Sequence, residues 1–254
     1  MSRLRRAARL AYLLAQHPLH LHRGLVRRGL TLGWIDEVRP YLNAPGVKPV
    51  GLPVDEYSSY QAVRYILARE FRQAHPTGEP WEHDYNPILS HLWRREMHPL
   101  RWLPAAWHLR TCRTVLEYGC GVAPYAHGVT TAWPFAQQLV VTDLEGPFLN
   151  YCRWWFRGDS RVTVLSVDMV MPEDHRAPEI RGRFDGIVCT EVFEHLADPV
   201  NVAEWMTRNA GVVCFDYVDD HSDARRATLR LFASNGYFRG PDARGLDVWR
   251  RTSC

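Results

Sequence analysis

The sequence has little lysine, no long apolar run and no closely spaced pair of cysteines. Lys48 is the single lysine among 31 basic residues, and the others are all arginine. No stretch approaches the roughly 20 consecutive apolar residues that a bilayer-spanning helix needs, so we expect no membrane span. Scattered cysteines indicate neither a disulfide framework nor a cysteine zinc site, and they suit a reducing cytoplasm. The six are Cys112, Cys120, Cys152, Cys189, Cys214 and Cys254.

The first 35 residues lack acidic side chains but hold seven arginines, so the remainder of the chain is mildly acidic. This segment has the basic start of a signal peptide, yet its apolar run is short and no small-residue cleavage site follows. We therefore expect an amphipathic helix that is retained in the protein. Its arginines could bind RNA, anionic lipid or an acidic partner, or could simply form a solvated helix face.

The chain changes character near residue 112. Residues 1–111 contain helix-like segments broken by Pro and Gly, and they predict a helical lid that covers a substrate site. Aromatic and histidine side chains there make Tyr57, His83 and Tyr85 weak candidates for contacts with a substrate, although most such residues would pack in a helical layer. Residues 112–254 form the second predicted region, which carries the catalytic chemistry.

Short β-branched runs recur about every 25 residues after position 112, with helix-length segments between most of them. This pattern is typical of successive βα units and predicts an α/β fold, a Rossmann-like doubly wound sheet. Two more strands are expected around 237–239 and 246–251, after a helix-like run that Gly236 can end. The five main runs are 114–118, 139–142, 162–167, 185–190 and 211–216.

Ligands of such sheets bind beyond the carboxyl ends of the strands, and acidic residues stand at most of these ends. Gly119 and Gly121 allow a sharp turn after the first run, and Glu117 just before them would repel a dinucleotide phosphate but suits a cationic cofactor. Asp143, after the second run, can accept hydrogen bonds from both hydroxyl groups of a ribose. Asp168, after the third run, offers an acceptor for the adenine amino group, and Met169 beside it offers an apolar surface for the ring. Asp143 and Asp168 could instead cap the segments that follow them.

These residues resemble a known family. The stretches VLEYGCGVAPY, VVTDLEG, SVDM and FDGIVCTEVFEHLADP are similar to class I S-adenosylmethionine-dependent methyltransferases, most closely to the branch with ubiquinone-pathway O-methyltransferases. The resemblance covers about 112–254 and implies a seven-stranded sheet that ends in an antiparallel strand pair. It also implies the cofactor contacts. The methionine part would face Glu117, Gly119, Cys120 and Gly121. The ribose would contact Asp143 and Leu144, and the adenine would contact Asp168 and Met169. Glu191 would shape the pocket.

The segment after the fourth run supplies candidates for catalysis. If a helix begins at Thr190, then Glu191, Glu194 and His195 share one face. Imidazole is suited to remove a proton near neutral pH, so His195 is the candidate general base, although a carboxylate could hold it for structure alone. Glu191, Glu194 and His195, with His221 from after the fifth run, could also hold a divalent metal, an alternative that we do not favour.

The sequence therefore predicts a methyltransferase acting on oxygen or nitrogen of a small-molecule acceptor. One alternative is an RNA 2′-O-methyltransferase, assisted by metal, but the mildly acidic body disfavours nucleic acid as a partner. A second alternative is a non-catalytic adaptor of the same fold. Acids at three successive strand ends argue against the adaptor, since a protein without a cofactor has no need of them. Neither the acceptor nor the oligomeric state follows from the sequence.

Overall fold

The computed structural model describes residues 7, 11, 91–92, 101–133, 135, 137–167, 183–196, 198–216, 223–240 and 246–252. The chain divides into two compact units, one of Met1–Ala7 with Arg101–Cys254 and the other of Ala8–Leu100. The predictions for Tyr57, His83 and Tyr85 lie outside the described residues. Within the described part of the chain, no helix is both long and apolar enough to cross a bilayer.

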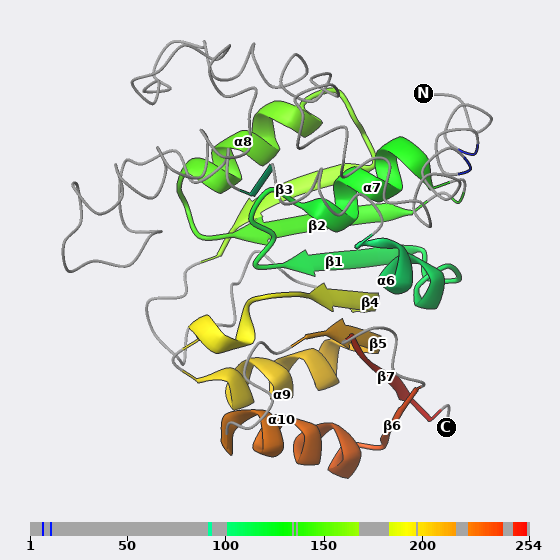
Figure 1. Cartoon of the computed structure of the whole chain (residues 1–254), viewed down its shortest axis with the longest axis vertical. Helices are drawn as coiled ribbons and strands as arrows, with labels where there is room; N and C mark the ends of the chain where they lie inside the picture. The colour runs from blue at the N-terminus through cyan, green and yellow to red at the C-terminus, as the bar shows by residue number, and fades with distance from the viewer. Residues whose placement is uncertain are drawn as a thin grey trace, which may run out of the picture. The chain divides into compact units, whose positions relative to one another are not determined.

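The larger unit contains a seven-stranded sheet in the order β3-β2-β1-β4-β5-β7-β6 (Figure 1). The strands from β1 to β5 pair in parallel, whereas β7 is antiparallel to both β5 and β6. The predicted α/β Rossmann-like fold is confirmed. The strands are β1 Thr114–Tyr118, β2 Gln138–Asp143, β3 Val162–Ser166, β4 Phe184–Cys189, β5 Ala210–Phe215, β6 Tyr237–Arg239 and β7 Asp247–Arg251.

The described helices precede or connect these strands, and four of the five α-helices have proline in their first turn. Proline occupies the first turn of α6, α7, α8 and α9, where the missing N–H costs no hydrogen bond. Asp198 also caps α9 by accepting a hydrogen bond from the backbone N–H of Asn201, at 3.0 Å. The helices are α6 Leu103–His108, α7 Pro124–Ala132, α8 Pro147–Phe156, the 3₁₀ helix η3 Phe193–His195, α9 Pro199–Asn209 and α10 Asp223–Ser234.

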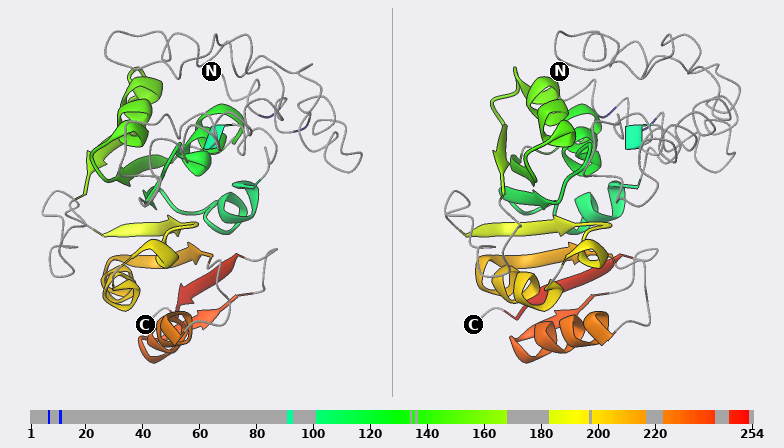
Figure 2. Two further views of the ribbon diagram at one scale, coloured as in Figure 1. Left: turned by 60° about the vertical axis from the view of Figure 1, so that its left-hand side comes forward. Right: turned by 90° about the vertical axis from the view of Figure 1, so that its left-hand side faces the viewer.

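Helices cover both faces of the sheet. Leu116 and Ile187 point to one face, where they share a buried core with Met206 of α9 and Phe232 of α10. Figure 2 shows α9 and α10 together beside the β4 and β5 part of the sheet. On the other face, a Cβ added to Gly186 would lie 2.4 Å from the side chain of Leu109, which directly follows α6.

The strand order reverses at β1, which has β2 on one side and β4 on the other. Connections from β1 and β4 therefore diverge, and ligands of such sheets bind at this switch point, beyond the carboxyl ends of the strands. The residues that follow β1, β2, β4 and β5 meet at this edge. It is the part of the fold in which a ligand site is expected.

Candidate functional site

A tight turn built on Gly119 and Gly121 follows β1. Both glycines have left-handed φ angles, of 63° and 53°, and Ala123 adopts a φ of 48° just before α7. The backbone N–H of Cys120 donates to the carbonyl oxygen of Thr142 on β2, at 2.9 Å. A Cβ added to Gly119 would lie 2.5 Å from a methyl carbon of Val192, so this position has neither the φ nor the space for a side chain.

Glu117 lies beneath this turn and is only 4% exposed. Its carboxylate accepts hydrogen bonds from the backbone N–H groups of Tyr125 and Ala126, at 2.9 and 2.8 Å, in the first turn of α7. Burial raises the pKa of Glu117 to about 8, although these two hydrogen bonds oppose the shift. Glu117 therefore joins β1 to the positive end of α7. Its predicted contact with the methionine part of a cofactor stays a prediction.

Asp143, the last residue of β2, connects the second strand to the glycine turn. One carboxylate oxygen accepts a hydrogen bond from the backbone N–H of Gly121 at 2.6 Å, and the other accepts from Leu144 at 2.7 Å. Burial raises the pKa of Asp143, against the effect of these hydrogen bonds. Each carboxylate oxygen can accept a further hydrogen bond, so the group can still bind a pair of hydroxyls.

Cys120 and Leu144, the other two predicted contacts on this side, differ in exposure. The Cys120 thiol is buried and lies 3.8 Å from the sulfur of Cys152 on α8. The Cys152 sulfur is in turn 3.3 Å from the carbonyl oxygen of Gly121. Leu144 is 37% exposed, which leaves an apolar side chain in solvent beside Asp143. Asp168 and Met169, the predicted adenine contacts, lie outside the described residues.

The segment after β4 does not form the predicted helix from Thr190. The regular part is a single 3₁₀ turn, η3, and Glu191 precedes it with a left-handed φ of 56°. A left-handed residue interrupts a right-handed helix, so Glu191 cannot share a helical face with Glu194 and His195. In the described part of the chain, no three His, Cys, Asp or Glu side chains form a group that could hold a metal ion. Glu191, Glu194 and His195 therefore do not form the metal site considered as an alternative. His221 lies outside the described residues.

Two charged residues that we did not assign from the sequence hold Glu191. Asp216, directly after β5, accepts a hydrogen bond from the backbone N–H of Glu191 at 2.5 Å. Arg101 contacts the carboxylates of both Glu191 and Asp216, at 2.8 and 3.3 Å. Asp216 follows a strand as the other acids do, so its position in the sequence could have identified it. Nothing in the sequence pattern singles out Arg101.

The charges of Arg101, Glu191 and Asp216 shift the pKa values of Arg101 and Asp216. Burial raises the pKa of Asp216, while the Glu191 backbone N–H and the charge of Arg101 oppose that shift. Burial lowers the pKa of Arg101, but the two carboxylates outweigh it and the pKa is raised overall. Arg101 therefore remains a cation between two acids, and the group acts as a closed ion-pair network.

Glu194 and His195 of η3 lie close to this network. Burial raises the pKa of Glu194, and the charges of Asp216 and Glu191 add to the effect although His195 opposes it. His195 is exposed, and its backbone N–H donates to the carbonyl oxygen of Val192 at 2.9 Å. Its predicted role as a general base is not tested by this geometry.

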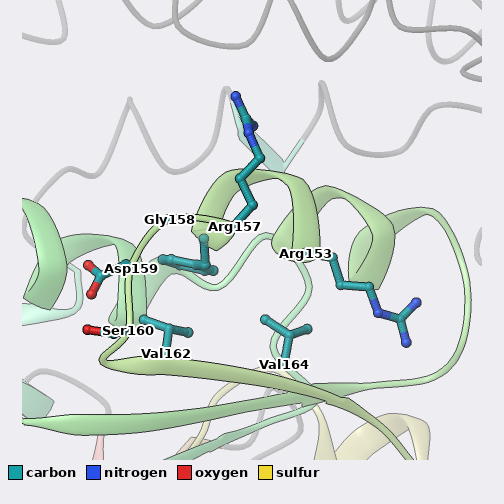
Figure 3. A pocket seen from close by; sticks show the side chains of 8 residues that line it. Arg153, Arg157, Gly158, Asp159, Ser160, Val162 and Val164 are labelled. Atoms are coloured by element: carbon teal, nitrogen blue, oxygen red, sulfur yellow. The ribbon is translucent and has the colours of Figure 1, made fainter.

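A separate groove of about 430 Å³ lies between the end of α8 and the start of β3. Figure 3 shows Val162 and Val164 of β3 below the helix, with Arg153 and Arg157 extending away from it. Val162 begins its strand, so this groove is at the amino end of β3. The glycine turn and the acids at the carboxyl ends of β1, β2, β4 and β5 make the better site.

Comparisons with known proteins agree with this placement. Residues 85–253 match the family model described as "Methyltransferase domain". The chain belongs to this methyltransferase family. The methyltransferase also has the fold of the pyocyanin biosynthetic protein PhzM, with a TM-score of 0.52 and 14% sequence identity over 89% of this chain and 73% of PhzM. These findings identify a methyltransferase domain with a Rossmann-like fold.

Two other solved structures resemble the methyltransferase more weakly. The amino pentose methyltransferase CalS10 from Micromonospora echinaspora, solved with S-adenosylmethionine, has a TM-score of 0.46 and 15% identity over 60% of this chain and 90% of its own. Magnesium protoporphyrin IX methyltransferase from Synechocystis PCC 6803, with bound S-adenosylhomocysteine, has a TM-score of 0.46 and 12% identity over 74% and 97%. No protein in a search of curated proteins matches the sequence.

Proposed function

We propose that this methyltransferase binds S-adenosylmethionine at the glycine turn and methylates an oxygen or nitrogen atom of a small molecule. The observation that carries the proposal is the pair of acids at this turn. Glu117 is buried directly beneath it, and Asp143 is hydrogen-bonded to Gly121 within it. Asp143 at the carboxyl end of β2 suits a ribose, and Glu117 at the end of β1, whose ionised form a bound cation would favour, suits a cation better than a diphosphate.

The residues present fit this cofactor. Asp143 would hold the ribose, with the exposed side chain of Leu144 beside it, and Gly119, Cys120 and Gly121 would bring backbone close to the methionine part. By the family resemblance, Asp168 and Met169 would hold the adenine, and Glu191 would shape the pocket. When bound, S-adenosylmethionine supplies a methyl group that is already activated by a sulfonium.

The protein's own contribution is then mainly to align the acceptor and exclude water. His195, exposed at the carboxyl edge, would take the proton from a hydroxyl or amine acceptor, with Glu194 beside it. A hydroxyl group of the kind methylated by ubiquinone-pathway O-methyltransferases is the first acceptor to test, on the basis of the sequence resemblance. CalS10 and PhzM belong to the biosynthesis of small molecules, which supports the same choice of acceptor class.

Calorimetry with S-adenosylhomocysteine tests the cofactor assignment. We expect micromolar binding by the wild-type protein and a loss of at least a hundredfold in Asp143→Ala, because the ribose loses its acceptor and the glycine turn loses its hydrogen bond. Asp185→Ala is the matched control, since Asp185 also accepts hydrogen bonds from two backbone N–H groups, of Arg113 and Thr114, but at the amino edge of β4. Wild-type binding of NAD instead of S-adenosylhomocysteine would contradict the proposal.

The acceptor class is tested by transfer of a radiolabelled methyl group. We expect label in phenolic or amine small molecules and none in structured RNA at physiological salt. Label in RNA at a rate that falls steeply with salt would favour the RNA alternative over a small-molecule acceptor.

A further inference from the structure

We propose that Asp216 and Arg101 are positioning residues that hold the segment after β4 against the glycine turn and thereby set the affinity for the cofactor. The inference rests on the proposed binding of S-adenosylmethionine at that turn. Neither side chain needs to contact the cofactor. Both act through Glu191 and its neighbour Val192.

Glu191 has an unusual backbone conformation. Its φ of 56° is a left-handed angle that a residue with a side chain adopts only when its surroundings impose it. Asp216 fixes the backbone of Glu191 through the 2.5 Å hydrogen bond to its N–H, and Arg101 fixes its carboxylate at 2.8 Å. The link between Arg101 and Asp216, at 3.3 Å, closes the network around this one residue.

Val192 carries the effect of this conformation to the glycine turn. Because Glu191 turns the chain, the next side chain, Val192, is buried against Gly119. The two Cγ carbons of Val192 lie 2.5 and 2.8 Å from the place that a Cβ on Gly119 would occupy. If Glu191 relaxed to a right-handed angle, Val192 would move and the turn would lose its support. The backbone that faces the cofactor would then be less well defined, and binding would have to restore it.

The network of Arg101, Glu191 and Asp216 lies at the carboxyl edge of the sheet. Arg101, Glu191 and Asp216 are 43%, 27% and 19% exposed, so the ion pairs are partly open to solvent and each adds little to global stability. A partly exposed network at the carboxyl edge, around a strained residue, is better explained by control of local geometry than by stability. Asp185 at the opposite edge of β4 again supplies the comparison, because its two hydrogen bonds join the start of β1 to β4 without any strained residue.

The experiment measures the Kd for S-adenosylhomocysteine by calorimetry well below the unfolding temperature, together with the free energy of unfolding in urea. We expect Asp216→Ala to raise Kd about tenfold, which corresponds to about 1.4 kcal/mol. Asp216→Asn keeps an oxygen for the Glu191 N–H but loses the ion pair, so we expect a rise of about threefold. Arg101→Gln also loses the ion pair, so we expect it to raise Kd by about threefold as well. Asp185→Ala should lower the unfolding free energy but leave Kd within about twofold of the wild type.

A second background separates positioning from a general loss of stability. Glycine adopts a φ of 56° without strain, so in Glu191→Gly the further change Asp216→Ala should raise Kd by less than about threefold. An unchanged Kd in Asp216→Ala, or an equal rise in Asp185→Ala, would overturn the inference while the proposed function stands. If Asp216→Ala does not fold, an unchanged Kd in both Asp216→Asn and Arg101→Gln overturns it. If the wild type does not bind S-adenosylhomocysteine, the proposed function fails, and the inference fails with it.

Discussion

Replacing Gly119 by alanine should destabilise the protein by an amount that can be worked out from two contributions. A side chain at the φ of 63° costs about 1–2 kcal/mol. The new Cβ would also lie 2.5 Å from a methyl carbon of Val192, and displacing a packed side chain costs about 1–3 kcal/mol. Alanine restricts the unfolded chain and returns about 0.4–1 kcal/mol. The free energy of unfolding should therefore fall by roughly 1–5 kcal/mol.

Urea denaturation measures this loss, and two further variants separate its causes. Gly158→Ala is the matched control, because a Cβ there meets nothing within 4 Å and the residue has no left-handed φ. Adding Val192→Ala to Gly119→Ala removes both Cγ carbons, so the steric part of the loss should be recovered and the strain part should remain. Equal losses at positions 119 and 158, or no recovery relative to Val192→Ala alone, would refute the close contact between the turn and the segment after β4.

Two more predictions concern Glu117 and His195. Burial raises the pKa of Glu117 from its usual 4.5 to about 8, so the folded protein binds this proton more tightly than the unfolded chain does. The free energy of unfolding should therefore decrease as pH rises from about 4.5 to 8, by up to about 1.4 kcal/mol per pH unit, and urea denaturation of Glu117→Gln should lack this slope. His195→Ala should bind S-adenosylhomocysteine normally but lower kcat by about 10²–10⁴ in methyl-transfer assays. Normal turnover in that variant would mean that His195 is not the base.

The central strands could be predicted closely from the sequence because β1, β4 and β5 are short, mostly buried runs rich in apolar residues. The run 114–118 is β1, and the candidate at 237–239 is β6, with the bounds that we predicted. Antiparallel pairing of β6 and β7 followed only from the family resemblance, since alternation within three to five residues does not specify direction. The helix predicted from Thr190 was wrong. Its pattern of apolar residues is helical, but the left-handed Glu191 is stabilised by Asp216, which lies 25 residues later in the chain.

In the site, too, contacts between residues close in the sequence could be predicted, and contacts between distant residues could not. The glycine turn was predicted correctly because Gly119, Gly121 and the start of α7 at Pro124 are neighbours in sequence. The partners of Glu117 were not predicted. We placed its carboxylate toward a cation, and the structure shows it hydrogen-bonded to the first turn of α7. These two positions are compatible, since a carboxylate that accepts two N–H groups retains lone pairs for a third partner.

The glycine turn and the segment after β4 therefore differ in how far apart in the sequence their contacting residues lie. The turn and Asp143 form one short βαβ segment, in which the 2.6 Å hydrogen bond from Gly121 joins residues only 22 apart. Arg101 and Asp216, by contrast, are 115 residues apart in the sequence and meet at 3.3 Å only in the folded protein. Substitutions at positions 101 and 216 can thus change the segment after β4 without altering any residue of the glycine turn. If Arg101 and Asp216 position this segment as proposed, such substitutions change the affinity for the cofactor while the glycine motif stays the same.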